Sequence, residues 1–379
     1  MKSVIERILS NMGLGNIVEA LSSENIDWAD FHTLLLYILE NRIHNINPVD
    51  IMKNYKENRF SATASVNQKE LLEIDRMLYK VLPGYFSAIE LSPVSAIGAN
   101  SVLAPLDPKI TLSTIRNLEV VSDSSMALSI ECAHRRRLLK TLRENTEIHL
   151  ATSHRMLRLQ KFSKDSSLTT HFRAFALASA ARDTEGLNSF ELSSISAHIK
   201  TWLDFLIQSL DSGYEAKNIS VAISDIRLIE KVVSDKHINR EELIRESKNR
   251  TFSPFRAYSI DLPDVIDSAD NIAITVPELE TYIRELQFTE KQIINSLRKE
   301  YPMVHFYFDL KRCSGAGYYS GICYTVTARN SAGNQHSLAG GGACDWTKKL
   351  LQSKKEHLVT SGFGTEFFSK LFRHNRSVA

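Results

Sequence analysis

Two short stretches of the sequence place several cationic side chains around a polar loop. "SHRMLRLQKF" contains Arg158, and "HFRAF" follows it after "SKDSSLTT", so a hairpin of two strands with a polar connection is expected. A guanidinium can grip a phosphate or carboxylate with two parallel hydrogen bonds, which makes Arg158 a candidate anion ligand. His154, Arg155, His171 and Arg173 flank the same hairpin. Because neighbouring strand positions point to opposite faces, only some of these side chains can reach one pocket.

A run of three glycines forms a second candidate site. Gly340, Gly341 and Gly342, in "SLAGGGACDW", lie between an expected strand and an expected helix. Glycine costs backbone entropy, so three in a row indicate that some group must approach bare backbone there. That group is either a ligand or, alternatively, a neighbouring strand at a bulge or a tight crossing.

The elements that must position these residues are helices and strands in alternation. Residues 1–80 are expected to be helical, with one helix beginning after Asp27 and the next carrying Pro48 in its first turn. "SISAHIKTWLDFLIQSL" has helical spacing, whereas "NISVAIS" alternates as a half-buried strand does. Residues 226–300 are expected to be a mostly helical insertion. The sequence therefore predicts an α+β fold, a largely antiparallel sheet flanked by helices over residues 81–379, with a small N-terminal helical segment.

Composition excludes several classes of protein. Lys and Arg total 46 and Asp and Glu 44, and this net charge of +2 argues against a general nucleic-acid-binding protein. No apolar stretch approaches the roughly 18 residues that span a bilayer. Cys132, Cys313, Cys323 and Cys344 form no CxxC pair and no zinc-ligand spacing. We therefore expect a cytoplasmic protein with reduced cysteines and no metal site.

The order of several stretches resembles the catalytic core of class II aminoacyl-tRNA synthetases, and specifically the histidyl-tRNA synthetase family. "IELSPVS" is similar to the first class II motif, and "HRMLRLQKF…THFRAF" to the second, a strand–loop–strand. "SGAGYYSGICYTV" resembles the family's Arg-Gly-Leu-Asp-Tyr-Tyr-Thr-Gly stretch, and "LAGGGACDW" its Ala-Gly-Gly-Gly-Arg-Tyr-Asp stretch. "SGFGTEFF" lies where the third motif is expected. The resemblance covers about residues 85–372 in the family's order.

The resemblance implies a nucleotide site with ATP and Mg²⁺ as candidate cofactors. Arg158 matches the second-motif arginine, which contacts the ATP α-phosphate and is the implied catalytic residue. Gln160 replaces the family's glutamate and keeps a hydrogen-bond acceptor without its charge. Phe175 matches the aromatic residue that stacks under adenine, although an aromatic side chain in a strand is also typical of a core.

The resemblance also implies an amino-acid pocket whose floor is the glycine strand, so that the ligand packs on backbone. Asp123, in "VSDSS", lies where the family has its carboxylate for the substrate ammonium. Alternatively Asp123 caps the helix that follows, with Ser124 and Ser125 as rival caps. The other implied substrate-binding residues are Gly315, Tyr318, Tyr319, Gly340, Gly341, Gly342 and Asp345.

Several residues of the family's pattern are missing. Phe367 stands where the third motif has the arginine that faces the ATP γ-phosphate, and Ser314 stands where the family has its histidine-specifying arginine. The further departures are Gly317, Ala343, Cys344 and Leu177. Losing two such arginines would remove on the order of several kcal/mol of transition-state stabilisation. The family's C-terminal anticodon-binding domain is also expected to be absent, so tRNA is not an expected partner.

Two functions follow from this pattern. The first is a histidyl-tRNA synthetase paralogue that has lost aminoacylation and binds an amino-acid-like or nucleotide-like ligand as a regulatory or partner subunit, a role that the family's ATP phosphoribosyltransferase regulatory subunit also has. Such a chain would be a homodimer with a partner surface on its N-terminal helices. The alternative is a stand-alone, adenylate-forming amino-acid ligase for a substrate other than histidine, with Arg312 restoring the missing charge. A metal-dependent enzyme using His154, His171 and Asp183 has little support, since their spacing matches no ligand pattern.

Overall fold

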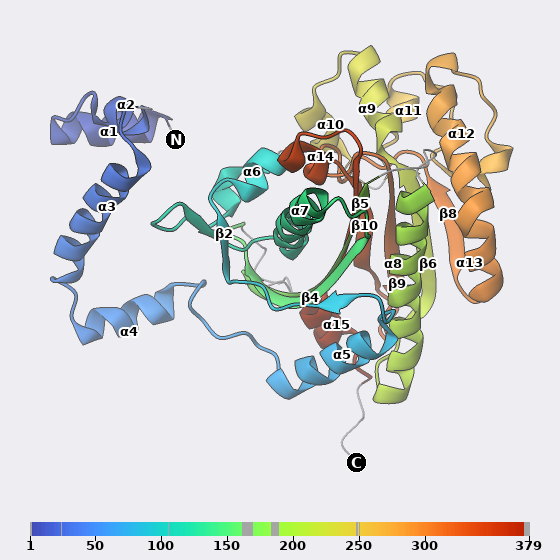
Figure 1. Ribbon diagram of the computed structural model, residues 1–379, viewed down its shortest axis with the longest axis horizontal. Coiled ribbons are helices and arrows are strands. Elements are labelled where there is room, and N and C mark those ends of the chain that lie inside the picture. Colours follow the sequence, from blue (N-terminus) through green and yellow to red (C-terminus); the bar gives the residue numbers. More distant parts are fainter. Residues whose placement is uncertain are drawn as a thin grey trace.

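A nine-stranded sheet runs through the centre of the computed structural model, which describes residues 2–23, 25–104, 106–160, 170–182, 189–247, 249 and 251–374 (Figure 1). The strand order is β1-β4-β5-β11-β10-β9-β6-β8-β7, and only the pairs β1–β4 and β6–β8 are parallel. The largely antiparallel sheet predicted from the sequence is thus confirmed. The strands are β1 (Ser87–Ala88), β4 (Ile148–Leu157), β5 (His171–Arg182), β6 (Lys217–Asp225), β7 (Val265–Ile266), β8 (His305–Asp309), β9 (Ile322–Arg329), β10 (Gln335–Cys344) and β11 (Glu356–Phe363). A separate pair joins β2 (Val94–Ala96) to β3 (Leu118–Val120).

Helices cover both faces of this sheet. On one face lie α7 (Ser124–Leu142), in the hollow of β4 and β5, and α14 (Trp346–Leu351) (Figure 1). On the other face lie α8 (Ser189–Gln208), α5 (Gln68–Val81) and α15 (Thr365–Leu371). The expected insertion after β6 contains α9 (Ile226–Asp235), α10 (Arg240–Glu246), α11 (Pro254–Ala257), α12 (Glu280–Thr289) and α13 (Asn295–Glu300), the last two joined by a π-helical turn, Glu290–Ile294. The short α6 (Ala99–Leu103) precedes β3.

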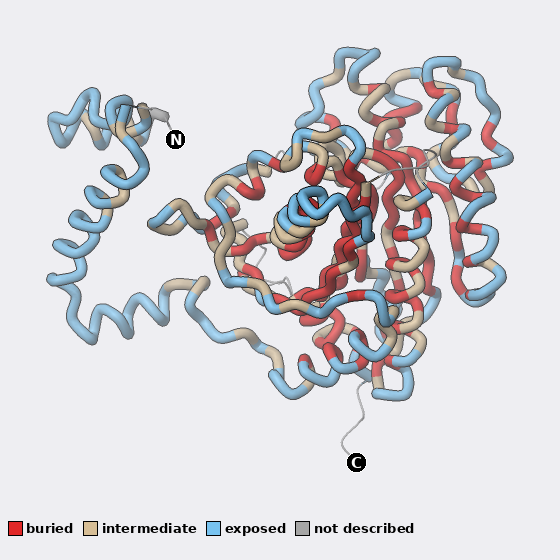
Figure 2. Tube along the Cα trace, in the orientation of Figure 1, coloured by how far each residue is buried: buried red, intermediate tan, exposed pale blue. Residues whose placement is uncertain are grey.

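The first four helices extend away from the rest of the chain as an arm (Figure 2). They are α1 (Lys2–Met12), α2 (Ile17–Ser22), α3 (Trp28–Ile43) and α4 (Pro48–Glu57). Asp27 caps α3 and Pro48 opens α4, as the sequence predicted. No residue of α2, α3 or α4 is buried, whereas α5 buries Leu71, Ile74 and Leu78 against the core. The helical stretch 1–80 therefore divides into an arm, residues 2–57, and a core helix, α5.

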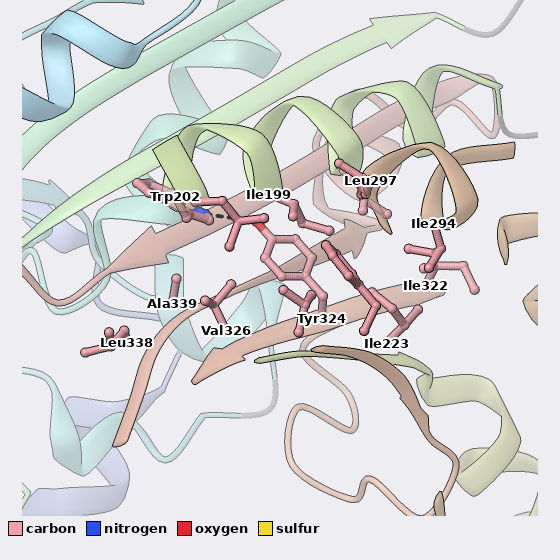
Figure 3. Packing of buried hydrophobic residues seen from close by; sticks show 14 of the residues in the cluster. Ile199, Trp202, Ile223, Ile294, Leu297, Ile322, Tyr324, Val326, Leu338 and Ala339 are labelled. Atoms are coloured by element: carbon pink, nitrogen blue, oxygen red, sulfur yellow. Dashed lines mark hydrogen bonds between the residues drawn. The ribbon is translucent and has the colours of Figure 1, made fainter. Parts of the chain in front are cut away.

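The larger hydrophobic core lies between α8 and the sheet (Figure 3). Trp202 of α8 is fully buried, and its indole Nε1 donates a hydrogen bond of 3.0 Å to the hydroxyl of Tyr324 on β9. Ile199 of α8 and Val326 of β9 pack beside this pair. The buried polar ends of Trp202 and Tyr324 satisfy each other, so both rings are held in the core at no cost in lost hydrogen bonds.

The glycine run of β10 is explained in part by this packing. A Cβ atom at Gly341 would lie 2.4 Å from the Cβ of Ser361 and 2.8 Å from the ring of Tyr324, and one at Gly342 would lie 2.5 Å from the Cβ of Cys323. Side chains and backbone of β9 and β11 therefore occupy the space over these two glycines. Only Gly340 has room for a side chain, with the Tyr319 hydroxyl 3.7 Å from its Cβ position. The alternative of a tight strand crossing thus accounts for Gly341 and Gly342.

Replacing Gly341 with alanine should destabilise the fold. The new methyl group meets backbone as well as side chains, because the carbonyl oxygen of Thr360 lies 2.7 Å from its position. Overpacking of this kind costs about 1–3 kcal/mol of unfolding free energy. Urea denaturation followed by circular dichroism measures the loss. Gly84→Ala is the control, since no atom lies within 4 Å of its Cβ position, and it should change stability by less than about 0.5 kcal/mol. Equal stability of the two variants would contradict this packing.

A chain of polar side chains crosses β4, β5 and α8 to β11. The exposed carboxylate of Glu147 contacts His149 Nε2 at 3.0 Å, and His149 Nδ1 lies 2.9 Å from the hydroxyl of Ser179. That hydroxyl lies 3.0 Å from His198 Nε2, and His198 Nδ1 lies 3.0 Å from the hydroxyl of Ser361. Burial, with a smaller contribution from His149, lowers the pKa of His198 from 6.5 to about 3. His198 is therefore neutral, donating through one ring nitrogen and accepting through the other.

The depressed pKa of His198 predicts that acid weakens the fold. The unfolded chain takes up a proton near pH 6.5 but the native chain only near pH 3, so the stabilisation is complete above about pH 6.5 and is lost as the pH falls. The expected slope is about 1.4 kcal/mol of unfolding free energy per pH unit for this residue. Urea titrations between pH 7 and pH 4.5 should show a smaller slope for His198→Asn than for the native chain. His305→Asn, at an exposed position, serves as the control, and an unchanged slope in His198→Asn would contradict the assignment.

Candidate functional site

The site predicted from the sequence is centred on Asp123, at the start of α7. One carboxylate oxygen, Oδ1, accepts hydrogen bonds from the backbone N–H groups of Ser125 at 2.9 Å and Met126 at 3.4 Å. Asp123 is therefore the N-cap of α7, which was one of its two expected roles. The positive end of the helix dipole favours a negative charge at this position.

Arg158, the first residue after β4, contacts the same carboxylate. Its Nε donates to the backbone carbonyl of Ser122 at 2.7 Å, and its Nη2 lies 3.4 Å from Asp123 Oδ2. Its guanidinium also lies 5.4 Å from the ring centre of Phe172. The side chain is still 30% exposed. Arg158 is thus anchored by the chain and yet accessible to an anion.

Tyr318 completes the contacts of Asp123. Its hydroxyl donates a hydrogen bond of 3.1 Å to Oδ2, the oxygen that Arg158 also contacts. Its ring packs edge-on against Tyr319 and Trp346, with centroids 4.9 and 4.8 Å apart. Burial, and then the nearby Asp123 carboxylate, raises the pKa of Tyr318 well above 10, so the hydroxyl stays protonated and donates. Both oxygens of Asp123 therefore already have partners within the protein.

Tyr319 covers the part of the glycine strand that has free space. Gly315 has a φ of +92°, and a Cβ there would lie 2.7 Å from the Tyr319 ring. The Tyr319 hydroxyl lies above Gly340, and the guanidinium of Arg312 lies 5.5 Å from the ring centre. The Tyr319 side chain therefore covers the predicted pocket floor at Gly340. Position 315 must be glycine because a side chain there would collide with the Tyr319 ring.

Phe175 does not lie in this site. It is fully buried on the opposite face of β5, where it packs edge-on against Tyr79 and Trp202. A ring enclosed in this way has no face free for adenine, which corrects the role implied by the resemblance. The physical reason is strand alternation: Ala174 and Phe172 face the site, and Phe175 faces the core.

The remaining predicted residues lie at the margins. Asp345 follows β10 and forms an ion pair of 2.9 Å with Lys349 on α14. Gln160 lies two residues after Arg158, and its backbone carbonyl accepts a hydrogen bond of 3.0 Å from Arg59. A second bond from Arg59 goes to Leu159, and Thr170, at the other end of the β4–β5 connection, donates to the Arg59 carbonyl. Arg59, two residues after the arm, therefore makes hydrogen bonds at both ends of the β4–β5 connection.

Solved structures share this architecture, although no protein-family model and no curated protein matches the sequence. A Bacillus halodurans C protein described as an ATP phosphoribosyltransferase regulatory subunit/histidyl-tRNA synthetase is 14% identical, with a TM-score of 0.61 over 82% of this chain and 81% of that one. The histidyl-tRNA synthetase of Nostoc sp. PCC 7120 is 14% identical, with a TM-score of 0.55 over 83% and 74%. A histidine–tRNA ligase subunit from Alicyclobacillus acidocaldarius subsp. acidocaldarius DSM 446 is 13% identical, with a TM-score of 0.57 over 81% and 94%.

The chain has the fold of a class II aminoacyl-tRNA synthetase core. The predicted resemblance is confirmed at the level of the fold. Phe367, which the resemblance places at the third-motif position, lies on α15. Its ring packs edge-on against His336, with centroids 5.4 Å apart, and against the main hydrophobic core. The side chain is thus part of the packing.

The candidate metal ligands in the described part of the core do not form a cluster. Within the described ranges, no three His, Cys, Asp or Glu side chains are grouped so that they could hold a metal ion. His154 and His171 lie on the paired strands β4 and β5, while Asp183 lies outside the described residues. ATP with Mg²⁺ stays a prediction, and of its predicted ligands only Arg158 has its side chain beside Asp123 and Tyr318.

Two polar residues with a buried side-chain oxygen were not predicted from the sequence. Asp309 ends β8, and Ser224 lies near the end of β6. Both follow apolar strand residues at an inward position, and a polar side chain that interrupts such a strand was the available signal. Arg312, which the sequence did single out, lies near them.

Removing the Asp123 carboxylate should destabilise the site. Asp123→Ala deletes the cap of α7 and leaves Arg158 and Tyr318 without their shared acceptor. The expected loss is about 2 kcal/mol of unfolding free energy, which urea denaturation measures. Asp27→Ala, which deletes the cap of α3 in the exposed arm, is the matched control and should leave the main unfolding transition unchanged. A native-like transition in Asp123→Ala would show that the carboxylate does not support the fold.

Proposed function

We propose that this chain is a histidyl-tRNA synthetase-like paralogue that has lost tRNA aminoacylation and binds an amino-acid-like or nucleotide-like ligand as a regulatory or partner subunit. The observation that carries the proposal is the packing of the partly buried Phe367 ring against the hydrophobic core, at the position where the resemblance calls for an arginine. An enzyme that activates an amino acid must neutralise the charge that builds up on the phosphates. A phenyl ring cannot supply that charge.

The anchoring of Arg158 supports the same proposal. Its Nε bonds to Ser122 and its Nη2 to Asp123, so the guanidinium that should grip the α-phosphate is already partly used in holding α7. Asp123 in turn has hydrogen-bond donors on both oxygens. The two residues that resemble catalytic machinery thus serve the fold, and binding of a ligand remains as the function of the face around Tyr319.

The N-terminal arm supports a partner-binding role. Its helices expose large apolar side chains along their whole length, among them Trp28, Tyr37, Ile43, Val49 and Ile51. Apolar area of this extent on a monomer is typical of an interface. We propose that the arm contacts a protein partner and that the core forms a homodimer. The cysteines in the described part of the chain are unpaired and buried, which fits a reducing compartment such as the cytoplasm. No helix of the described chain is both long and apolar enough to cross a membrane.

The alternative, an adenylate-forming ligase for an amino acid other than histidine, is favoured by one observation. Arg158 keeps 30% of its side chain exposed beside Asp123, so a phosphate can still approach it from solvent. Arg312 is a second cation on the same face, over the ring of Tyr319.

Amino-acid-dependent ATP–pyrophosphate exchange separates the two functions. The full chain is assayed with each of the twenty amino acids, beside Arg158→Ala and beside Arg245→Ala, which changes an exposed arginine of α10. We expect no exchange above background from any of the three proteins, because Phe367 and the anchored Arg158 leave the phosphates unneutralised. Exchange with one amino acid that is lost in Arg158→Ala and kept in Arg245→Ala would establish the ligase instead.

A further inference from the structure

Three buried polar atoms without a hydrogen-bond partner belong to residues at one edge of the sheet, two of them neighbours on β6 and β8 and the third on a residue whose charge acts on one of these neighbours. They are Ser224 Oγ, Asp309 Oδ1 and Arg312 Nη1, and none of them bonds to any residue in the described part of the chain. Ser224 and Asp309 lie at the carboxyl ends of β6 and β8, which are parallel neighbours and so end at the same edge. Buried polar atoms are nearly always paired in native proteins, so three orphans at one edge of the sheet indicate a missing partner.

The strand register places Ser224 and Asp309 on the face of the sheet that carries Tyr319. Ile223 pairs with Phe308, so the next residues, Ser224 and Asp309, are neighbours. On its other side Ser224 pairs with Cys323, which pairs with Gly342 of the glycine strand. Residues directly opposite one another in a sheet share a face. A row of small or polar side chains therefore crosses from the glycine strand to Asp309.

Arg312 is held over this row by its own loop. Its Nε donates to the backbone carbonyl of Ser314 at 3.0 Å, and its guanidinium lies over the ring of Tyr319. The positive charge of Arg312 acts on both Cys323 and Asp309. Burial raises the pKa of the Asp309 carboxyl, and Arg312 is the largest influence that opposes this rise. The two charges are thus near each other, yet Asp309 Oδ1 and Arg312 Nη1 do not bond.

Two opposite charges that are buried close together without contact are costly for a protein. Each loses part of its hydration, and the hydrogen bonds that each makes to the backbone do not pair the two charges with each other. Water molecules can satisfy individual hydrogen bonds but carry no charge. A group with a cationic donor at one end and an anionic acceptor at the other would satisfy all three atoms at once. The ammonium and carboxylate of a free amino acid form such a group.

We propose that Ser224, Asp309 and Arg312 form the subsite for the zwitterionic head group of a free α-amino acid. Asp309 and Ser224 receive the ammonium, and Arg312 binds the carboxylate, with the Tyr319 ring beside them. The inference rests on the proposed function and says which residues hold its ligand. It also moves the ammonium away from Asp123, whose oxygens already have Ser125, Arg158 and Tyr318 as donors.

Isothermal titration calorimetry of the full chain with each of the twenty amino acids tests the subsite. The amino acid that binds is then compared with its own carboxamide, which keeps the ammonium and lacks the carboxylate charge. On the native chain the carboxamide should bind at least tenfold more weakly, because a hydrogen bond between charged groups is lost. In Arg312→Gln this discrimination should nearly disappear, a change that a merely structural role for Arg312 would not produce.

Matched variants complete the test. Asp309→Asn and Arg312→Gln should each weaken binding of the amino acid at least tenfold, whereas Asp270→Asn and Arg245→Gln, the same changes at exposed positions, should stay within twofold. An amino acid that binds both subsite variants as tightly as the native chain would overturn the subsite and leave the proposed function standing. Failure of the native chain to bind any amino acid would instead refute the amino-acid ligand of the proposed function. The carboxamide comparison uses the native chain, so it decides the question even if a variant does not fold.

Discussion

The close approach of β9 and β11 to β10 is the constraint on which the centre of this sheet depends. Gly341 makes room for Tyr324 and Ser361 on one face, and Gly342 makes room for Cys323 on the other. Tyr324 in turn takes the hydrogen bond from Trp202 that fixes α8 against the sheet. A side chain on either glycine would separate the strands that carry the core on one face and the candidate site on the other. The glycine run is thus first a requirement of packing, and only Gly340 has space beside a ligand face.

The charged side chains around the candidate site fall into two groups, one paired within the protein and one with unpartnered atoms. Asp123, Arg158 and Tyr318 satisfy one another and tie the start of α7 to the end of β4 and to the loop before β9. Arg312 lies over the ring of Tyr319, and Arg312 Nη1 and Asp309 Oδ1 lack partners among the described residues. Groups that are already paired stabilise a fold, whereas buried groups that are unpaired gain most from a ligand. The residues that most resemble a catalytic centre are therefore the ones with least left to offer a substrate.

The sequence predicted much of the fold because its signals are local. The cap at Asp27, the place of Pro48 in the first turn of α4, the helical spacing of α8 and the apolar alternation in the sequence of β6 all depend on neighbours within a few residues. The expectation that β6 is half-buried was wrong, because the strand lies inside the sheet and is buried on both faces from Ile219 on. The face to which a strand residue points depends on long-range register, and for that reason the sequence assigned Phe175 to a site that it does not reach. The partners of Asp123 come from residues 35 and 195 positions away, and no local pattern encodes those contacts. Asp309 and Ser224 were missed for the same reason: their lack of partners is visible only once the strands are assembled.

Hydrogen bonds of Arg59 connect the arm to the chain beside the candidate site. Its guanidinium bonds to the carbonyls of Leu159 and Gln160, and its own carbonyl accepts a bond from Thr170. Arg158 lies directly before the first of these residues and bonds through its backbone N–H to Thr170. The connection between β4 and β5 is therefore gripped at both ends by the residue that links the arm to the core. A partner that displaced the far helices of the arm would therefore act on the chain one residue from Arg158, next to its contact with Asp123.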